Sequence, residues 1–241
     1  FFVTNFWEHF SPEKQLPQAG NLARAAKTAG VKHVVWSTLE DTRKLVPLSD
    51  DRMPTLQEKY KVPHFDAKGE ADALFEQAGV PTTYLLTSFY WDNLIHFGMG
   101  PKPGADGVLE FVLPMDEAKL PGIAAEDIGR SAYGIFKAGD EFIGKHVAIA
   151  GEHLNGMEMA CALSEALGQR VRHSAVSPAE FRAFGFPGAD DLGNMFQYKR
   201  DFEADFRKPR DVEATRRLNP RLQSFSQWLA ANAAQIPLQG G

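Results

Sequence analysis

The feature that most constrains the fold is a regular alternation of short apolar runs with helical patterns in the first part of the chain. The apolar runs lie at residues 1–3, 33–38 and 82–87. Between them, apolar residues recur every three to four positions over residues 16–26 and 65–78, which is the period of a helix. Strands that alternate with helices over short connections favour right-handed crossovers in a parallel sheet. The sequence therefore predicts an α/β fold with a doubly wound, Rossmann-like sheet.

The pattern after residue 88 is less regular. Residues 39–62 mix charges and prolines, which predicts a long loop with some helix. The further predicted strands are residues 108–113 and 145–150, and the further predicted helices are residues 89–97, 127–136, 155–167, 178–184, 190–198 and 224–234. We expect a sheet domain over residues 1–150 and a smaller, mainly helical lobe over residues 151–241 that is interleaved with it.

Composition narrows the class of protein. The chain has 241 residues, 44% of them hydrophobic, and 26 basic against 31 acidic side chains give a net charge of −5. This mixture is typical of a soluble globular protein and gives no electrostatic reason to expect direct nucleic-acid binding. No apolar run approaches the roughly 18–20 residues that span a bilayer, so we expect no membrane partner.

A single cysteine, Cys161, excludes an intramolecular disulfide and a multi-cysteine zinc site. Because it lies on an apolar stretch of a predicted helix, we expect it to be packed inside. A cytoplasmic compartment is the simplest interpretation. The histidines are scattered without metal-ligand spacing, so no metal is expected.

Polar and aromatic side chains follow the predicted strands at residues 4–7, 37–40 and 88–93. In doubly wound sheets, ligands bind beyond the carboxyl ends of the strands, where these segments would meet. Each segment alone fits a helix cap or a turn equally well. His64 and Lys68 are four residues apart on the helix after the Ser37 strand, so they share one helix face. With Ser37 they could orient a carbonyl, a ribose and a proton donor. A solvated lysine and a helix-start histidine are the alternative.

The order of these elements resembles the NmrA-like family, whose members are atypical short-chain dehydrogenase/reductase folds that bind NADP(H). The similarity extends from Phe1 to about Trp228. It is carried by residues 3–8, 37, 64–70, 89–94, 185–189, 191–192 and 194–196.

The resemblance implies that residues 1–150 bind NADP(H), or NAD(H), and it assigns roles by position. Ser37, His64 and Lys68 would occupy the catalytic positions, with histidine where active dehydrogenases have tyrosine. The implied cofactor contacts are Thr4, Asn5, Phe6, Lys68, Tyr90, Trp91, Asp92 and Asn93. The histidine favours a redox sensor with a role in transcriptional regulation over an efficient enzyme. The alternatives are an NAD(P)H-dependent reductase of quinones or related carbonyl compounds, and an interaction module without cofactor. A protein partner on the C-terminal lobe and a homodimer are compatible with the resemblance.

The family begins with a strand, a glycine-rich turn and a helix that receives the pyrophosphate. No such element stands in these residues, because 98–104 has the wrong glycine spacing. We therefore expect the chain to be a fragment in which residues 1–3 are the family's fourth strand. The expected strand order is residues 1–3, 33–37 and 82–87 outward from an open edge, with later strands beyond. We expect this piece to bind dinucleotide poorly and to self-associate.

Two further segments have less specific interpretations. Residues 199–221 hold eight basic and five acidic side chains, which favours a solvated or partner-facing surface. An apolar stripe could line a substrate cleft, although such stripes more often form core; its members are Phe184, Phe186, Met195, Phe196 and Tyr198.

Overall fold

A computed structural model describes residues 1–238 of the chain and divides into two compact units. Unit 1 comprises residues 1–87, 132–148 and 182–195, and unit 2 comprises the segments between and after them. Packing therefore interleaves the chain, and residues 88–131 belong with the C-terminal third. The functional division at residue 150 differs from this partition and stays a prediction.

The sheet of unit 1 is parallel and has the order β1-β2-β7. Its strands are β1 (Val34–Thr38), β2 (Thr82–Leu86) and β7 (His146–Ala148). Phe2 forms a parallel bridge with Trp36 on the other side of β1. The predicted strand order is confirmed, but the first segment is an isolated bridge rather than a full strand.

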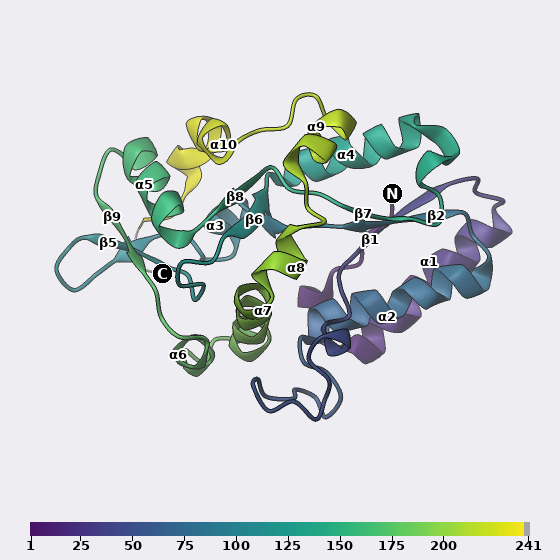
Figure 1. The fold of residues 1–241 in the computed structure, drawn as a ribbon, viewed down its shortest axis with the longest axis horizontal. Coiled ribbons are helices and arrows are strands. Elements are labelled where there is room, and N and C mark those ends of the chain that lie inside the picture. Colours follow the sequence, from purple (N-terminus) through teal and green to yellow (C-terminus); the bar gives the residue numbers. More distant parts are fainter. Residues whose placement is uncertain (239–241) are drawn as a thin grey trace. The chain divides into compact units, whose positions relative to one another are not determined.

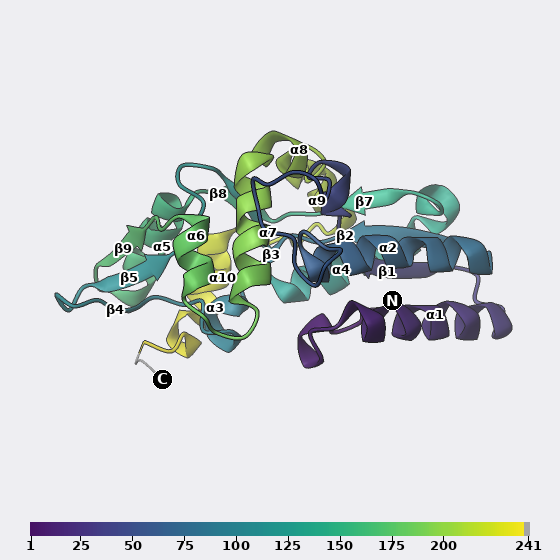
Figure 2. The ribbon, with the colours of Figure 1, turned by 90° about the horizontal axis from the view of Figure 1, so that it is seen from below.

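Helices α1 (Pro12–Thr28) and α2 (Pro63–Ala78) run side by side in Figures 1 and 2 and pack closely on each other. Helix α1 begins before the predicted apolar period because Ser11 caps it: the Ser11 hydroxyl accepts a hydrogen bond from the Lys14 N–H. Small residues of α1 let it approach α2 and the sheet. The core cluster contains Ala19, Ala23, Ala26, Val34, Trp36, Ala71, Phe75, Val80 and Tyr84.

Unit 2 holds two further sheets, of order β3-β6-β8 and β4-β5-β9. The strands are β3 (Phe89–Tyr90), β4 (Lys102–Pro103), β5 (Leu109–Val112), β6 (Leu120–Ile123), β8 (Glu152–Leu154) and β9 (Val171–Ser174). The remaining helices of the chain are α3 (Asn93–His96), α4 (Ala125–Lys137), α5 (Gly156–Leu167), α6 (Pro178–Ala183), α7 (Ala189–Asp201), α8 (Glu203–Arg207), α9 (Val212–Leu218) and α10 (Phe225–Asn232). Short 3-10 turns are η1 (Phe6–Glu8), η2 (Thr42–Lys44), η3 (Gly139–Phe142) and η4 (Ala233–Gln235). The helix predicted at residues 89–97 is instead a short strand followed by α3.

The expectation that Cys161 is packed is wrong, because its side chain is exposed. The buried face of α5 consists of Gly156, Met159, Ala160 and Leu163. Cys161 follows Ala160 by one position, which is about 100° around a helix, and therefore points to solvent.

The basic segment at residues 199–221 is less solvated than predicted. Arg210 is fully buried, with its guanidinium carbon 3.6 Å from the centre of the Phe206 ring and its Nη1 donating to the Phe206 carbonyl. Lys199 is also buried, and its ammonium lies 5.2 Å from the same ring. Long cationic side chains can be buried where aromatic faces and carbonyls receive the charge.

The apolar stripe predicted near the C-terminal third divides into two parts. Met195, Phe196 and Tyr198 are buried, whereas Phe184 and Phe186 are exposed. The first three therefore form core, as such stripes usually do.

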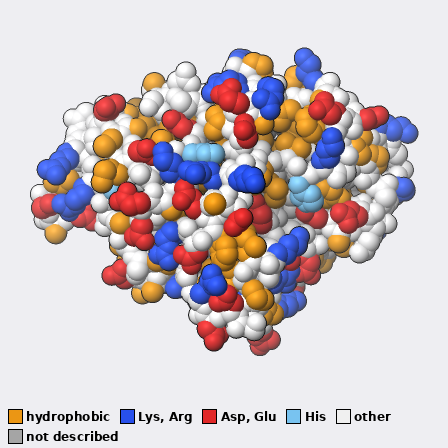
Figure 3. All heavy atoms as spheres, viewed as in Figure 1, with side chains coloured by type: hydrophobic (Ala, Val, Ile, Leu, Met, Phe, Trp, Pro, Cys, Tyr) orange, Lys and Arg blue, Asp and Glu red, His pale blue; other side chains and the backbone are white. Residues whose placement is uncertain are grey.

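On the face seen in Figure 3, basic and acidic side chains are interspersed rather than gathered by sign. Among the described residues, every helix is too short or too polar to cross a membrane.

Candidate functional site

Lys68 connects the ends of two neighbouring chain segments in unit 1. Its ammonium donates hydrogen bonds to the Thr4 carbonyl at 3.2 Å, to the Thr4 hydroxyl at 3.3 Å and to the Ser37 carbonyl at 3.3 Å. Thr4 follows the Phe2 bridge, and Ser37 lies near the end of β1. The structure therefore brings together Thr4, Ser37 and Lys68 at a strand exit, where the sequence predicts a site.

The ammonium of Lys68 is buried, with 8% of the residue exposed. Desolvation lowers its pKa to about 8, against an attraction to Asp72 that raises it. The face of the Trp36 ring lies 5.1 Å from Nζ. The Ser37 hydroxyl has no hydrogen-bond partner within residues 1–238, although the residue is 3% exposed. The strand exit therefore contains the Lys68 cation, held by three hydrogen bonds, and the Ser37 hydroxyl, which has no partner within residues 1–238.

His64 lies one turn before Lys68 and pairs with a carboxylate that sequence reasoning gave no role. Its Nδ1 is 2.6 Å from Asp191 Oδ1, and its backbone N–H donates to Asp191 Oδ2 at 3.1 Å. Both residues are buried. The ring also contacts Trp7 and Phe65, with centroids 4.7 and 4.8 Å away. A carboxylate only accepts hydrogen bonds, so Nδ1 is the donor.

A cavity of about 290 Å³ adjoins this pair and is lined by Phe6, Phe10, Leu56, Gln57, Pro63, Pro187, Gly188, Asp190 and Asp191. Phe10 and Gln57 both adopt left-handed backbone conformations, with φ of 53° and 47°. The Gln57 side chain donates to the Phe10 carbonyl and joins the two walls. Such conformations are uncommon outside glycine and concentrate at ligand sites.

Gly188 closes another wall of the cavity in a conformation that favours glycine. Its φ is +83°, and an added Cβ would lie 3.0 Å from Trp7 Cζ3. The segment before α7 can therefore approach η1 only without a side chain at this position.

Asp66 organises the loop that precedes α2. One carboxylate oxygen accepts from the Thr42 N–H and hydroxyl, and the other accepts from the N–H groups of Lys61 and Val62. Burial raises the pKa of Asp66, against these hydrogen bonds, which lower it. Residues 42 and 61–62 are thereby fixed next to the start of α2.

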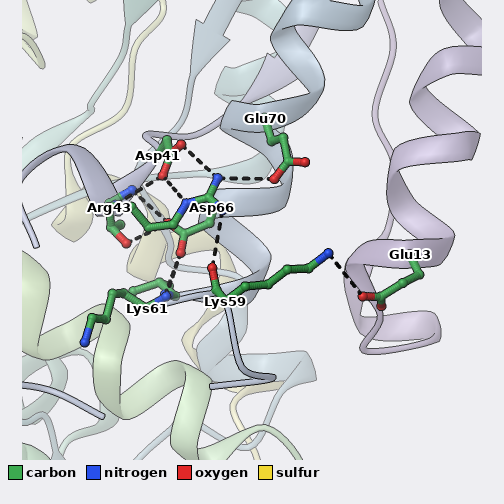
Figure 4. A network of polar contacts seen from close by, with 9 residues as sticks. Glu13, Asp41, Arg43, Lys59, Lys61, Asp66 and Glu70 are labelled. Atoms are coloured by element: carbon green, nitrogen blue, oxygen red, sulfur yellow. Dashed lines mark hydrogen bonds and ion pairs between the residues drawn. The ribbon is translucent and has the colours of Figure 1, made fainter. Parts of the chain in front are cut away.

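A charged network surrounds Asp66 and is drawn in Figure 4. The Arg43 guanidinium makes two hydrogen bonds to Asp41 and one to Glu70 on α2. Gly69 allows this approach, because a Cβ there would lie 2.7 Å from the Asp41 backbone nitrogen. Lys59 extends the network to Glu13 on α1, 3.8 Å away. Residues 64–70, which carry most of the resemblance, therefore combine site residues with residues that fix the loop.

The other predicted cofactor contacts lie in different surroundings. Asn5 is exposed and caps η1 by accepting from the Trp7 N–H, and Phe6 is buried against the His64 ring. Residues 90–93 belong to unit 2.

Within unit 2, Tyr90 and Asn93 are half-buried, and Asp92 caps α4 by accepting from the Ala125 N–H at 2.7 Å. Trp91 is 1% exposed and packs on Gly122 and among aromatic rings of α10. Their contact with a nicotinamide stays a prediction. Within residues 1–238, no group of three or more His, Cys, Asp or Glu side chains could hold a metal ion.

Comparison with known proteins identifies the family. The chain matches the NmrA-like family over residues 1–229. It belongs to the NmrA-like family. Among curated proteins, it is 30% identical over 165 residues to an NAD(P)H azoreductase of Xenophilus azovorans, covering 68% of this chain and 51% of that protein. It is 29% identical over 171 residues to the nitrogen metabolite repression protein nmrA of Emericella nidulans, covering 67% and 45%. The chain thus spans about half the length of these two relatives.

Solved structures confirm the α/β fold. NmrA, a negative transcriptional regulator in complex with NAD, superposes with a TM-score of 0.70 at 23% identity, covering 89% of this chain and 68% of that one. The Citrobacter sp. triphenylmethane reductase complexed with NADP(H) gives 0.69 at 17% identity, covering 93% and 73%. The predicted α/β class with a helical C-terminal part is therefore confirmed for this NmrA-like chain.

Sequence reasoning missed Asp191, Asp66 and the cavity. Asp191 was part of the resemblance, but no periodicity connects residues 127 positions apart. Asp66 could have been suspected as a buried acid between His64 and Lys68 on the same helix.

Proposed function

We propose that this NmrA-like chain is part of an NADP(H)-binding redox sensor that regulates other proteins and turns over little or no substrate. Family membership supports this proposal, and so do relatives named as nitrogen metabolite repression proteins and solved NmrA complexes with NADP and NAD. A protein partner on the C-terminal lobe, a homodimer and a cytoplasmic location belong to the proposal.

The observation that carries the proposal is the strand exit around Lys68. A ribose offers hydroxyl groups that both donate and accept hydrogen bonds. The exit holds the Lys68 ammonium in hydrogen bonds to Thr4 and Ser37 and presents an open hydroxyl on Ser37. His64, one turn before Lys68, has an open ring nitrogen. These groups fit the ribose next to a nicotinamide. Thr4, Asn5 and Phe6 are the further proposed cofactor contacts of unit 1, and residues 90–93 of unit 2 stay predicted contacts of the nicotinamide.

A reductase is the second candidate, and the pairing of His64 with Asp191 favours it. A histidine that a carboxylate orients can exchange a proton with a ligand. A bound nicotinamide would supply the hydride, and His64 would supply the proton to a quinone or a related carbonyl compound. Relatives named as an azoreductase and a triphenylmethane reductase support this alternative.

Titration calorimetry of the full-length protein with NADPH tests the binding proposal. Lys68→Ala should weaken binding by about 1.5–3 kcal/mol, the cost of one charged hydrogen bond. Lys32→Ala, at an exposed lysine, is the matched control. Equal affinities in the two variants would refute the assignment.

Steady-state oxidation of NADPH with quinones separates the two candidates. The sensor should be slow, and His64→Tyr, which places the dehydrogenase residue there, should raise the rate. Turnover near about 10 per second by the unmodified protein would favour the reductase.

A further inference from the structure

We propose that Asp191 is a positioning residue that holds His64 with its proton on Nδ1 and so presents Nε2 to the ligand. The nature of that ligand rests on the proposed function. The positioning itself rests on contacts between α2 and the start of α7, all within unit 1.

The two hydrogen bonds fix the carboxylate and the ring in one arrangement. Asp191 Oδ2 accepts from the backbone N–H of His64, and Oδ1 accepts from the ring at 2.6 Å. The His64 backbone N–H is part of helix α2, so its hydrogen bond fixes the orientation of the Asp191 carboxylate. The carboxylate in turn fixes the orientation of the ring. The contacts with Trp7 and Phe65 restrict rotation of the ring further. The imidazole is therefore held by the carboxylate and by two neighbouring aromatic rings.

The free ring nitrogen is the one that reaches solvent. Nε2 has no hydrogen-bond partner within residues 1–238, and it is absent from the enclosed polar atoms that lack partners. It therefore has accessible surface although the residue is only 6% exposed. The lining of the neighbouring cavity includes Asp191, which holds His64, and Pro63, which precedes it in the chain.

The local structure at the start of α7 stabilises the Asp191 carboxylate in its position. It lies in the first turn of α7, where the helix dipole favours a negative charge. Its backbone N–H donates to the side chain of Asp190 at 2.9 Å. Gly188 permits the close approach of this segment to Trp7.

The pairing determines what His64 can do with a proton. The neutral ring, with hydrogen on Nδ1, accepts a hydrogen bond from a ligand hydroxyl at Nε2. With a nicotinamide bound to supply the hydride, the protonated ring would give its Nε2 proton to the oxygen of a carbonyl group whose carbon takes the hydride. It then becomes the same neutral tautomer, still bonded to Asp191. Charge and protons balance without rotation of the ring.

The test is the tautomer of His64, read from two-bond ¹H–¹⁵N spectra of histidine-labelled full-length protein at a pH where the ring is neutral. His64→Gln removes one set of signals and assigns it. Unmodified protein should show the Nδ1–H tautomer. In Asp191→Asn, the backbone N–H of His64 should hold the amide oxygen, so the amide NH₂ should face Nδ1 and move the proton to Nε2. Asp190→Asn alters a side chain that accepts from the Asp191 N–H and makes no hydrogen bond to His64 within residues 1–238, so it should keep the Nδ1–H tautomer.

Each outcome decides the proposal. An Nε2–H tautomer in the unmodified protein would overturn it even if Asp191→Asn fails to fold. An unchanged tautomer in a folded Asp191→Asn variant would overturn it as well. Failure of unmodified protein to bind NADPH, together with the expected tautomers, would reject the proposed function and leave the positioning role in place.

Discussion

Replacing Lys68 with methionine should flatten the dependence of stability on pH between about pH 7.5 and 9.5. Burial lowers the pKa of Lys68 from 10.5 to about 8. A base whose pKa is lower in the folded state binds fewer protons there than when unfolded. The resulting penalty is complete below about pH 8 and disappears as the pH rises toward 10.5, so stability rises with pH.

The magnitude follows from linkage. A lowering of this size corresponds to about 3 kcal/mol at low pH. Between about pH 7.5 and 9.5, roughly 2 kcal/mol of that penalty should be relieved. The interval ends at about pH 9.5 so that ionisation of Tyr84 does not contribute to the measurement. Burial raises the pKa of this tyrosine in the folded chain. An unfolded tyrosine ionises near pH 10, so this residue would lower stability with further increase in pH.

Urea unfolding at several pH values measures the effect, with the free energy of unfolding taken from each curve. The unmodified chain should gain about 2 kcal/mol over the interval relative to Lys68→Met. Lys32→Met, at an exposed lysine, should follow the unmodified chain. Parallel pH profiles for the unmodified chain and Lys68→Met would refute the account of a costly buried ammonium.

Two other substitutions test the walls and the loop of the site by the same unfolding measurement. Asp66→Asn places an amide NH₂ against buried N–H donors and should cost about 3 kcal/mol, whereas Glu70→Gln, which loses a half-exposed ion pair, should cost less than about 1 kcal/mol. Equal losses would contradict the anchoring role of Asp66. Gly188→Ala should cost at least about 1 kcal/mol more than Gly185→Ala, because both positions have positive φ but only the first meets Trp7 at 3.0 Å. A cost for Gly188→Ala no larger than that for Gly185→Ala would show that Trp7 moves to make room for the added methyl group.

The sequence by itself determined the local elements of unit 1 and the order of its strands. Helical and β-like periods locate β1, β2 and the helix α2, and the spacing of His64 and Lys68 places both on one turn of that helix. These features depend on near neighbours in the chain, which is why a pattern of apolar residues reveals them. The placement of Lys68 at the strand exit follows from the same topology.

Only the tertiary structure decided which distant groups meet. Asp191 faces His64, Cys161 points outward, and Arg210 is buried beneath an aromatic ring. Periodicity assigns a residue to a face of a helix but does not identify what packs against that face. A carboxylate near a helix start, a cysteine on an apolar stretch and an arginine in a charged segment look alike in many sequences. Their burial and partners depend on contacts between segments far apart in the chain, and those contacts exist only once the chain has folded.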